Sequence, residues 1–450
     1  MYKLVDNQYE LKNFHAWLES QKGQFVGLDT ETTGLRPLTS KVLLLQIGNK
    51  QQQFVLDIAR LQKPGSDEIA HVLKQINKYD IKCIAHNAQF DYKMLKHHFG
   101  VELENIVCTL LSARLLTMGF SFNISMSLEH TLERYLGIKI EKETRATFHE
   151  MSYGEEFTEE QVRYSAFDVA HLVPLKDVLM KKLDRAGLLK IALVEFNTIK
   201  VTGDMELNGA LIDTKLWKAL EEVALGEADN IKKELDSLFA PYVEERNLFD
   251  EVIINYNSQP QMVKYLSKAL GQTLKSTDVK TLTKINKPIT NKLLAYRKQM
   301  KLASTYGSDF LKNNLDVDGK IRSDFNQLGA DTGRYASKNP NLQNIPRDNR
   351  YRRPFIAPSG YKFISTDFSG QELRLLAHLS EEPEMIKALK ENKDLHSYSA
   401  SLLYNIPYED FFEYEDEAKT IIKKDSKGDP VFVDAMKKLR TNTKSITFGL

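Results

Sequence analysis

Short apolar runs dominate the first third of the chain and predict a sheet. Residues 25–29 (FVGLD) predict a buried strand, and the runs at 42–48 (VLLLQIG) and 53–58 (QFVLDI) predict its neighbours. A further apolar run at 83–85 precedes an amphipathic stretch, which predicts a strand followed by a helix. This order of elements indicates an α/β domain, for which we expect the boundaries 1–187.

Longer helical patterns with many charged residues follow this domain. We expect a helical section over residues 188–319 and a last section over 320–450, in which strand and helix patterns mix. In the last section, the apolar pair Phe363 and Ile364 predicts a strand that ends at Asp367, before a turn and a helix.

The charge balance restricts how this chain could bind nucleic acid. Its 450 residues are enough for two or three domains, and 42% of them are hydrophobic and 27% charged. The formal net charge of +1 excludes a generally basic surface, so nucleic-acid binding would need a local patch. One such patch lies between Lys320 and Arg353, where eight Lys or Arg residues stand against three Asp or Glu residues.

Cysteine content and hydropathy bear on the compartment. Cys83 and Cys108 are too few for a disulfide framework, and neither has the spacing of metal ligands, which suits a reducing cytoplasm. The N-terminal stretch lacks the apolar core of a signal peptide, and no run approaches the roughly 18 apolar residues of a membrane span. We therefore expect a cytoplasmic protein without a membrane partner.

Two acids close the first predicted strand. Asp29 and Glu31 are two residues apart, so they point to the same side of an extended chain. Two carboxylates on one side repel each other unless a cation lies between them, and Mg²⁺ and Mn²⁺ prefer such oxygen ligands. The motif alone fits either a metal site or a turn with solvated acids.

Two later stretches add polar residues at the start of predicted helices. Asn87, Phe90 and Asp91 follow the apolar run at 83–85. Further on, the sequence FTEEQVRYSAFDVAHL contains a capping box, and Tyr164 follows it on the same predicted helix as Asp168, four residues later. A tyrosine beside an aspartate is often only a core pair, so this motif by itself leaves its role open.

Taken together, these motifs resemble the three exonuclease motifs of the DEDD superfamily, Tyr subtype, found in the proofreading domains of DNA polymerases. The matching residues are Asp29, Glu31, Asp91, Tyr164 and Asp168. The resemblance implies a ribonuclease H-like fold and hydrolysis of the 3′-terminal phosphodiester, with two Mg²⁺ or Mn²⁺ ions held by the four carboxylates. It also implies that Tyr164 positions the attacking water and that Asn87 and Phe90 hold the terminal nucleotide.

A polar string at 323–355 interleaves amides with arginines, which suits contact with sugar and phosphate better than a core. It resembles the TGR and NLQNIP block of family A DNA polymerases, which implies that Arg334, Gln343 and Arg347 bind DNA. Asp331 stands where that family commonly has Thr. The stretches at 254–266 and 293–306, which precede this string, could simply be two amphipathic helices, although their order resembles the thumb of family A polymerases.

The stretch DFSGQELR resembles the palm motif of the same family. The resemblance implies that Asp367 binds metal in nucleotidyl transfer and that Glu372 lies against the sugar. His396, in the sequence DLH, resembles the family's DIH motif and would contact the incoming dNTP. Between Tyr404 and Leu439 the chain is longer than the usual connection, so we expect a surface insertion there.

The last helical pattern places Arg440, Lys444 and Phe448 four residues apart, on one face of a helix. Spacing alone fits a solvated face. After the upstream motifs, however, these residues resemble the fingers helix of family A polymerases, which implies binding of a dNTP. No later His-Asp-Glu type motif supplies the second palm aspartate, so we expect an incomplete polymerase site in this chain.

The fold class implied by these resemblances is an α/β ribonuclease H-like exonuclease domain, a helical thumb, and an incomplete α+β palm and fingers. The main hypothesis is the N-terminal portion of a DNA-directed family A polymerase with proofreading. A stand-alone 3′-5′ exonuclease and a non-catalytic DNA-binding subunit of a split polymerase remain alternatives. The partners implied are primer–template DNA, single-stranded 3′ ends, and a C-terminal polymerase fragment or processivity factor. Because Asp29 lies so near the start, a 5′ nuclease domain has no room, and we expect a streamlined enzyme of a bacterial or phage-infected cell, or an organelle.

Overall fold

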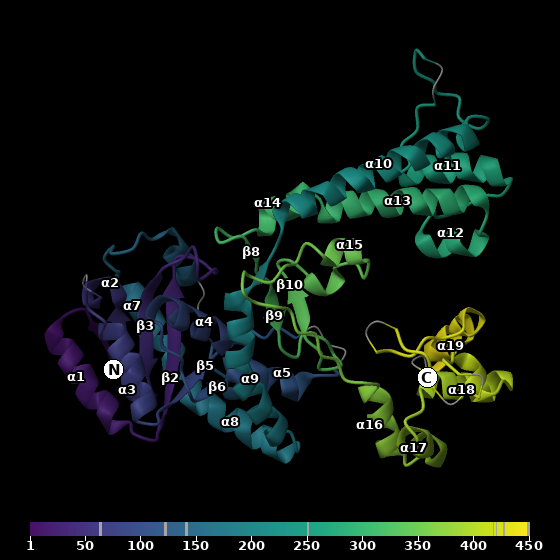
Figure 1. Cartoon of the computed structure of the whole chain (residues 1–450). Coiled ribbons are helices and arrows are strands. Elements are labelled where there is room, and N and C mark those ends of the chain that lie inside the picture. The colour runs from purple at the N-terminus through teal and green to yellow at the C-terminus, as the bar shows by residue number, and fades with distance from the viewer. Residues whose placement is uncertain are drawn as a thin grey trace. The chain divides into compact units, whose positions relative to one another are not determined.

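The computed structural model consists of two compact units, Met1–Lys362 and Phe363–Leu450, and each is described by itself (Figure 1). The structure describes the whole chain except residues 63–64, 121–123, 140–142, 250–251, 417, 420, 426–427 and 448–450. The division into 1–187, 188–319 and 320–450 stays a prediction.

A six-stranded mixed sheet lies in the N-terminal α/β part of the first unit, in the order β1-β4-β3-β2-β5-β6. The strands are β1 (Tyr2–Val5), β2 (Phe25–Thr32), β3 (Val42–Gly48), β4 (Gln53–Asp57), β5 (Lys82–Ala85) and β6 (Ile106–Cys108). β3 is antiparallel to both of its neighbours, and the remaining pairs are parallel. The strands predicted from the four apolar runs are confirmed.

Helices cover both faces of this sheet, because both faces are apolar. Side chains alternate along a strand, so Phe54 and Leu56 pack on one face of β4 and Val55 on the other. The first face is covered by α1 (Gln8–Ser20), α3 (Glu68–Lys78), α4 (Ala88–Phe99) and α9 (Leu189–Asn208). The other face is covered by α7 (Glu159–Ala170) and α8 (Leu172–Arg185). The predicted α/β fold class is confirmed. The smaller helices are α2 (Ile58–Leu61), α5 (Thr109–Thr117), α6 (Leu128–Leu136) and the 3-10 helix η1 (Glu143–Glu150).

The expected helical section is also present in this unit. Two long helices, α10 (Thr214–Phe239) and α13 (Pro288–Tyr306), lie side by side, and α11 (Gln259–Leu270) and α12 (Val279–Ile285) pack near one end of them (Figure 1). Their buried core includes Leu235, Phe239 and Leu293. The short helix α14 (Ser308–Asn314) follows α13. None of the described helices is long and apolar enough to cross a membrane.

A small antiparallel hairpin returns from the later chain to the α/β part. Its strands are β9 (Asp324–Asn326) and β10 (Ala336–Lys338), and it follows the pair β7 (Ala210–Leu211) and β8 (Lys320–Ile321). Gln89 of α4 donates from Nε2 to the carbonyl oxygen of Phe325 at 3.3 Å, and Gln327 donates from Nε2 to the carbonyl oxygen of Glu195 on α9 at 2.9 Å. The hairpin is therefore attached to two helices of the α/β part. The 3-10 helix η2 (Leu342–Asn344) and α15 (Asn349–Arg352) complete this unit.

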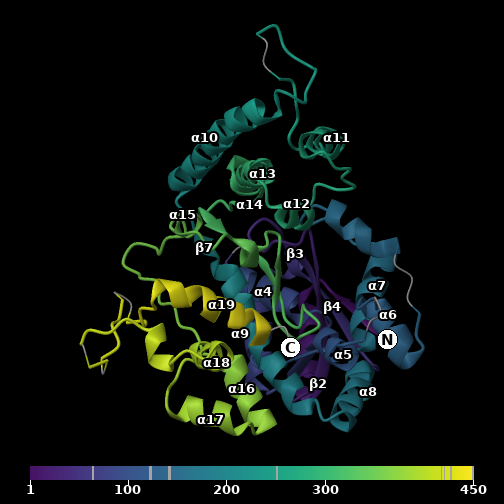
Figure 2. The same cartoon turned by 90° about the vertical axis from the view of Figure 1, so that its right-hand side faces the viewer.

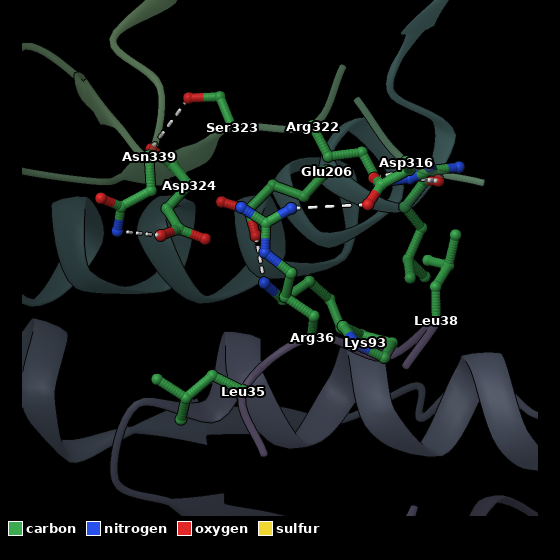
Figure 3. A pocket seen from close by; sticks show the side chains of 12 residues that line it. Leu35, Arg36, Leu38, Lys93, Glu206, Asp316, Arg322, Ser323, Asp324 and Asn339 are labelled. Atoms are coloured by element: carbon green, nitrogen blue, oxygen red, sulfur yellow. Dashed lines mark hydrogen bonds and ion pairs between the residues drawn. The ribbon is translucent and has the colours of Figure 1, made fainter. Parts of the chain in front are cut away.

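Several ion pairs lie around a small cavity that is lined by the loop after β2, by α4 and α9, and by residues between 316 and 339 (Figure 3). Arg36 in this loop lies 3.4 Å from Asp316, which also pairs with Arg322 at 2.9 Å. Lys93 of α4 pairs with Glu206 of α9, and both side chains are nearly buried. The Arg36 to Asp316 contact thus joins the segment that follows Glu31 to the later part of the chain, and the Lys93 to Glu206 pair joins α4 to α9.

The second unit is helical. It contains α16 (Gln371–Ser380), α17 (Pro383–Lys390), α18 (Leu395–Tyr404), the 3-10 helix η3 (Tyr408–Phe411) and α19 (Asp434–Thr447), and successive α-helices contact one another (Figure 2). The strand predicted at Phe363 and Ile364 is wrong, because this stretch is irregular and the two side chains are 65% and 87% exposed. A strand needs a neighbour for its backbone hydrogen bonds, and no described residue pairs with this stretch.

Most described residues between Tyr404 and Leu439 are exposed or half-buried, as expected of a surface insertion, but two of them are buried. Phe411 and Phe412 are buried against Ala400 of α18. Isolated antiparallel bridges join Phe412 to Phe432, and Tyr414 to Ile422. The segment therefore forms a small apolar core with the helices on either side of it.

Candidate active site

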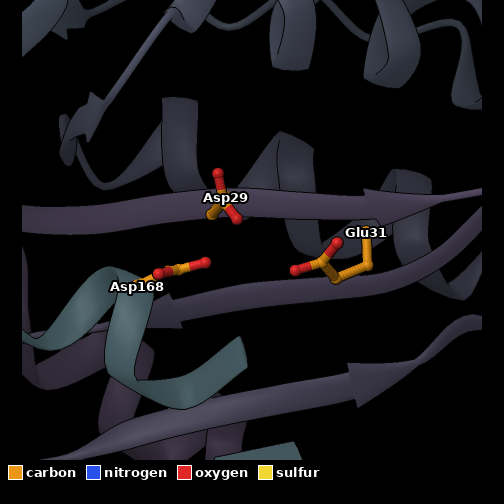
Figure 4. A group of neighbouring side chains, drawn as sticks. All are labelled: Asp29, Glu31 and Asp168. Atoms are coloured by element: carbon orange, nitrogen blue, oxygen red, sulfur yellow. The ribbon is translucent and has the colours of Figure 1, made fainter. Parts of the chain in front are cut away.

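Three carboxylates meet where β2 passes α7. Asp29 and Glu31 alternate with Thr30 along β2 and so reach the same side of the strand, as their spacing predicts. Asp168 reaches them from α7, and one oxygen of each acid lies within 4.8 Å of the others (Figure 4). Glu31 and Asp168 are buried, and Asp29 is half-buried.

Asp91 is the fourth predicted acid, and it lies outside this close group but lines the same cavity. It stands in the first turn of α4, is 2% exposed, and accepts a hydrogen bond of 2.8 Å from the Thr30 hydroxyl. Burial, reinforced by the negative charge of Asp29, raises the pKa of Asp91 well above its ordinary value. Additional positive charge at this position would oppose that shift.

The carboxylates line a cavity of about 440 Å³. All seven residues predicted for the exonuclease site line it: Asp29, Glu31, Asn87, Phe90, Asp91, Tyr164 and Asp168. Asn87 precedes α4 in the left-handed conformation, with φ 68°, which asparagine adopts more readily than most residues. Its amide makes no capping bond to the helix, and the residue is exposed.

The position of Tyr164 follows from a local signal. The capping box that begins α7 is confirmed, because the Thr158 hydroxyl accepts from the Gln161 amide nitrogen at 3.2 Å and Gln161 Oε1 accepts from the Thr158 amide nitrogen at 2.9 Å. The ring of Tyr164 packs near Phe148, with 6.3 Å between their centroids. The cap sets where the helix begins and thereby which face carries Tyr164 and Asp168.

Other residues, which the sequence did not indicate as site residues, also line this cavity. His86 hydrogen bonds to the Thr109 hydroxyl at 2.9 Å and to the carbonyl oxygen of Met126 at 2.7 Å, so both ring nitrogens are engaged. Arg114 comes from α5, and Lys338 comes from the hairpin. The local sequence holds no signal for these positions, because distant parts of the chain bring them to the cavity.

The donor set fits a divalent metal ion. Clustered carboxylate oxygens in a half-buried cleft are ligands that hard divalent cations prefer. Without positive charge, three acids within 4.8 Å of one another would repel in a region that water screens poorly.

The predicted basic patch is partly neutralised. Arg322 pairs with Asp318 at 2.7 Å, and Arg350 pairs with Glu227 at 3.0 Å. Arg334 and Arg347 are exposed. Gln343 binds the backbone, because it donates to the carbonyl oxygen of Tyr335 at 2.9 Å and accepts from the amide of Ser337 at 3.3 Å. DNA binding by Arg334, Gln343 and Arg347 stays a prediction.

The residues predicted for nucleotidyl transfer lie in the second unit. Asp367 and Glu372 are both exposed. Asp367 lies in the irregular stretch before α16, and Glu372 lies in the first turn of α16. His396 is half-buried in α18, and its pKa is lowered, first by burial and also by the charges of Arg440 and Lys444. His396, Arg440 and Lys444 therefore lie close enough to influence one another. Phe448 lies outside the described residues.

Arg440 already has a partner in this unit. It forms two hydrogen bonds of 2.9 Å with Asp394, the residue that caps α18, and its guanidinium lies 4.6 Å from the ring centroid of Phe432. Although burial alone would raise it, the pKa of Asp394 is lowered by the hydrogen bonds from Arg440 and Ser397. This pairing joins α19 to α18 and holds the Arg440 side chain in one orientation.

Comparison with known proteins identifies the family. Residues 2–184 match the 3′-5′ exonuclease domain, and residues 227–423 match DNA polymerase family A. DNA polymerase I of Borreliella burgdorferi is 30% identical over 422 residues, which cover 90% of this chain and 44% of that protein. DNA polymerase I of Aquifex aeolicus is 30% identical over 432 residues, which cover 89% of this chain and 67% of that protein. This chain thus spans less than half of the first relative's length.

The fold has a solved counterpart. The polymerase domain of Pol1 from M. smegmatis, solved in complex with DNA primer-template and dNTP, aligns with a TM-score of 0.74 and 23% sequence identity. The alignment covers 100% of this chain and 71% of that one. With the sequence matches above, this chain belongs to DNA polymerase family A and carries a 3′-5′ exonuclease domain in its N-terminal part.

Proposed function

We propose that this chain removes nucleotides from the 3′ end of a DNA strand in a divalent-metal-dependent reaction, as the proofreading part of a family A polymerase. The observation that carries the proposal is the group of Asp29, Glu31 and Asp168, whose oxygens lie within 4.8 Å of one another in a cavity large enough for a nucleotide. The match of residues 2–184 to a 3′-5′ exonuclease domain supports it.

The chain's own residues would divide the work as follows. Asp29, Glu31, Asp91 and Asp168 would hold two Mg²⁺ or Mn²⁺ ions, which activate water and stabilise the charge that develops on the leaving 3′ oxygen. Tyr164 would orient the attacking water from α7. The exposed amide of Asn87 and the ring of Phe90 would bind the terminal nucleotide from the start of α4.

The polymerase part of the proposal rests on the second unit. Template-directed nucleotidyl transfer would use Asp367 for metal binding and Glu372 against the sugar, with a dNTP bound by His396, Arg440, Lys444 and Phe448. Primer–template DNA is the substrate that this proposal implies, and the relatives named DNA polymerase I support it. A cytoplasmic location and a C-terminal or processivity partner stay predictions.

The exonuclease proposal is tested with 5′-labelled single-stranded DNA and Mg²⁺, comparing Asp29→Ala with the control Asp184→Ala, an exposed acid on α8. Loss of one metal ligand removes several kcal/mol of transition-state stabilisation, so we expect a roughly 10³-fold slower release of 3′ nucleotides from Asp29→Ala. The control should match the unmodified chain, and EDTA should stop both. Retained hydrolysis in Asp29→Ala would exclude this site.

A further inference from the structure

A buried glutamine lies beside the carboxylate group. Gln46 in β3 stands directly opposite Asp29 in β2, because the two strands pair antiparallel in that register. Residues opposite each other in an antiparallel pair carry their side chains on the same face, with Cβ atoms about 4.5–5.5 Å apart. On its other side Gln46 stands opposite Val55 of β4, which packs on the face that α7 covers. The Gln46 side chain therefore shares this face with Asp29 and is long enough to reach the Asp29 carboxylate.

The side-chain amide of Gln46 is buried and unpaired. The residue is 0% exposed, and neither Nε2 nor Oε1 has a hydrogen-bond partner among the residues that the structure describes. A buried amide in this state is unfavourable, since it has given up its hydrogen bonds to water without replacing them. Unpaired buried groups are rare in folded proteins, and catalytic sites are one of the places where they occur.

Another buried glutamine of the same sheet has the usual arrangement. Gln53, the first residue of β4, is 6% exposed, and its Nε2 donates to the carbonyl oxygen of Asn49. Gln53 stands opposite Gly48, away from the acids of β2. Lack of a partner is therefore not a general property of the glutamines in this sheet.

A second unpaired polar group comes from the helix that packs on this face. Ser165 of α7 is 0% exposed, and its Oγ also has no hydrogen-bond partner within the described part of the chain. Ser165 lies three residues before Asp168, so the two side chains are neighbours on the helix surface. The interface between α7 and the sheet thus holds two unpaired polar side chains, each next to one acid of the carboxylate group.

We propose that Gln46 and Ser165 are positioning residues for the metal-binding carboxylates. When the divalent ion that the proposed exonuclease function requires is bound, the Gln46 amide donates to Asp29 and the Ser165 hydroxyl donates to Asp168. Hydrogen bonds of this kind orient a metal ligand and favour its charged form. The proposal rests on the exonuclease function and adds the groups that hold two of its acids in place.

The proposal predicts opposite effects on stability and on metal affinity. Gln46→Met keeps the length of the side chain and removes the amide. Thermal unfolding of the metal-free chain in EDTA should give the same Tm or a higher one, because an apolar group of similar shape replaces an unpaired polar one. Calorimetric titration with Mn²⁺ should show about 10–100-fold weaker binding, the usual loss when a metal ligand loses its hydrogen-bond partner. Binding that Asp29→Ala abolishes identifies the site.

Two further variants keep the test decisive. Gln53→Met is the matched control, because it loses the hydrogen bond to Asn49 and should lower the Tm of the metal-free chain while Mn²⁺ affinity stays unchanged. Ser165→Ala tests the other side of the interface and decides the matter if Gln46→Met does not fold. It should leave the Tm unchanged or higher and weaken Mn²⁺ binding about tenfold.

The two proposals fail in different ways. A purely structural role for Gln46 gives a lower Tm with unchanged Mn²⁺ affinity, and that result would overturn the positioning proposal, as would unchanged affinity in both Gln46→Met and Ser165→Ala. If the unmodified chain binds Mn²⁺ at this site and releases no 3′ nucleotides, the exonuclease proposal is wrong. If it shows no Mn²⁺ binding that Asp29→Ala abolishes, both proposals are wrong.

Discussion

The ion pair between Lys93 and Glu206 gives a sharp test of how the cavity lined by the four carboxylates is held together. Lys93 lies on α4, two residues after Asp91, and its side chain is 11% exposed; that of Glu206 on α9 is 4% exposed. Glu206 also accepts a hydrogen bond from the amide of Phe325 in β9. One carboxylate therefore joins α4, α9 and the hairpin.

Replacing Lys93 by Met keeps the length of the side chain but leaves the Glu206 carboxylate buried without its cation. Breaking a buried pair in this way costs about 3–5 kcal/mol, whereas removing both charges together is often nearly neutral. We therefore expect Lys93→Met to lose about 3–5 kcal/mol and the double variant Lys93→Met/Glu206→Gln to regain most of it. The glutamine oxygen can still accept the bond from Phe325.

Lys96 provides the matched control on the same helix. Its side chain is 25% exposed and pairs with Asp204 and Glu102, which are 37% and 57% exposed, so Lys96→Met should cost about 1 kcal/mol or less. In urea unfolding with an m-value of about 3 kcal/mol/M, Lys93→Met lowers the midpoint by roughly 1–1.7 M and Lys96→Met by roughly 0.3 M. If Lys93→Met costs no more than Lys96→Met, the Lys93 to Glu206 pair does not hold the three elements together.

Two other sets of contacts give shorter tests. Asp394→Ala removes both the cap of α18 and the partner of Arg440, so thermal unfolding should show a loss of stability of about 2–3 kcal/mol. Asp394→Asn keeps a capping oxygen and should lose less stability. Equal losses in the two variants would mean that the cap contributes nothing. Burial alone would raise the pKa of Asp394, but the hydrogen bonds from Arg440 and Ser397 outweigh it and lower that pKa. The stabilisation that the Asp394 carboxylate provides is therefore complete above about pH 4 and is lost below that. The Tm difference between Asp394→Asn and the unmodified chain should shrink from about pH 6 to about pH 3.5. Burial raises the pKa of the Cys83 thiol to about 12 and also raises that of Cys108, so both should react slowly with dithionitrobenzoate until the chain unfolds, and fast labelling of the native chain would contradict their burial.

The grouping of the four acids around one cavity was largely predictable because its signals are local. Asp29 and Glu31 share one side of a strand through the period of two, and the capping box fixes the face of α7 that carries Tyr164 and Asp168. Asp29 and Glu31 lie within β2, Asp91 lies in the first turn of α4, and Asp168 lies in α7, so each acid belongs to an element that the sequence pattern indicates. The assignment of roles to these residues stays a proposal.

The features that the sequence did not reveal depend on distant contacts. Arg114 has no neighbouring motif, and only the hairpin's position gives it a place in the cavity. The Phe363 and Ile364 strand was wrong because an apolar pair predicts a strand only where a partner strand exists, and none of the described residues supplies one. Arg440 resembles a free nucleotide ligand in the sequence, but its bidentate pairing with Asp394 joins residues 46 positions apart.

These contacts make the cavity lined by the four carboxylates depend on the later chain. Glu206 binds Lys93 on the helix that carries Asp91, and it binds the amide of Phe325 in the hairpin that carries Lys338. Loss of the Glu206 carboxylate would loosen α4, which carries Asp91, as well as the hairpin, which carries Lys338, while the acids on β2 and α7 would stay in place. Damage to this junction should therefore reach the carboxylate cavity first through Asp91 and Lys338, because Asp29, Glu31 and Asp168 depend on the sheet and α7 and not on Glu206.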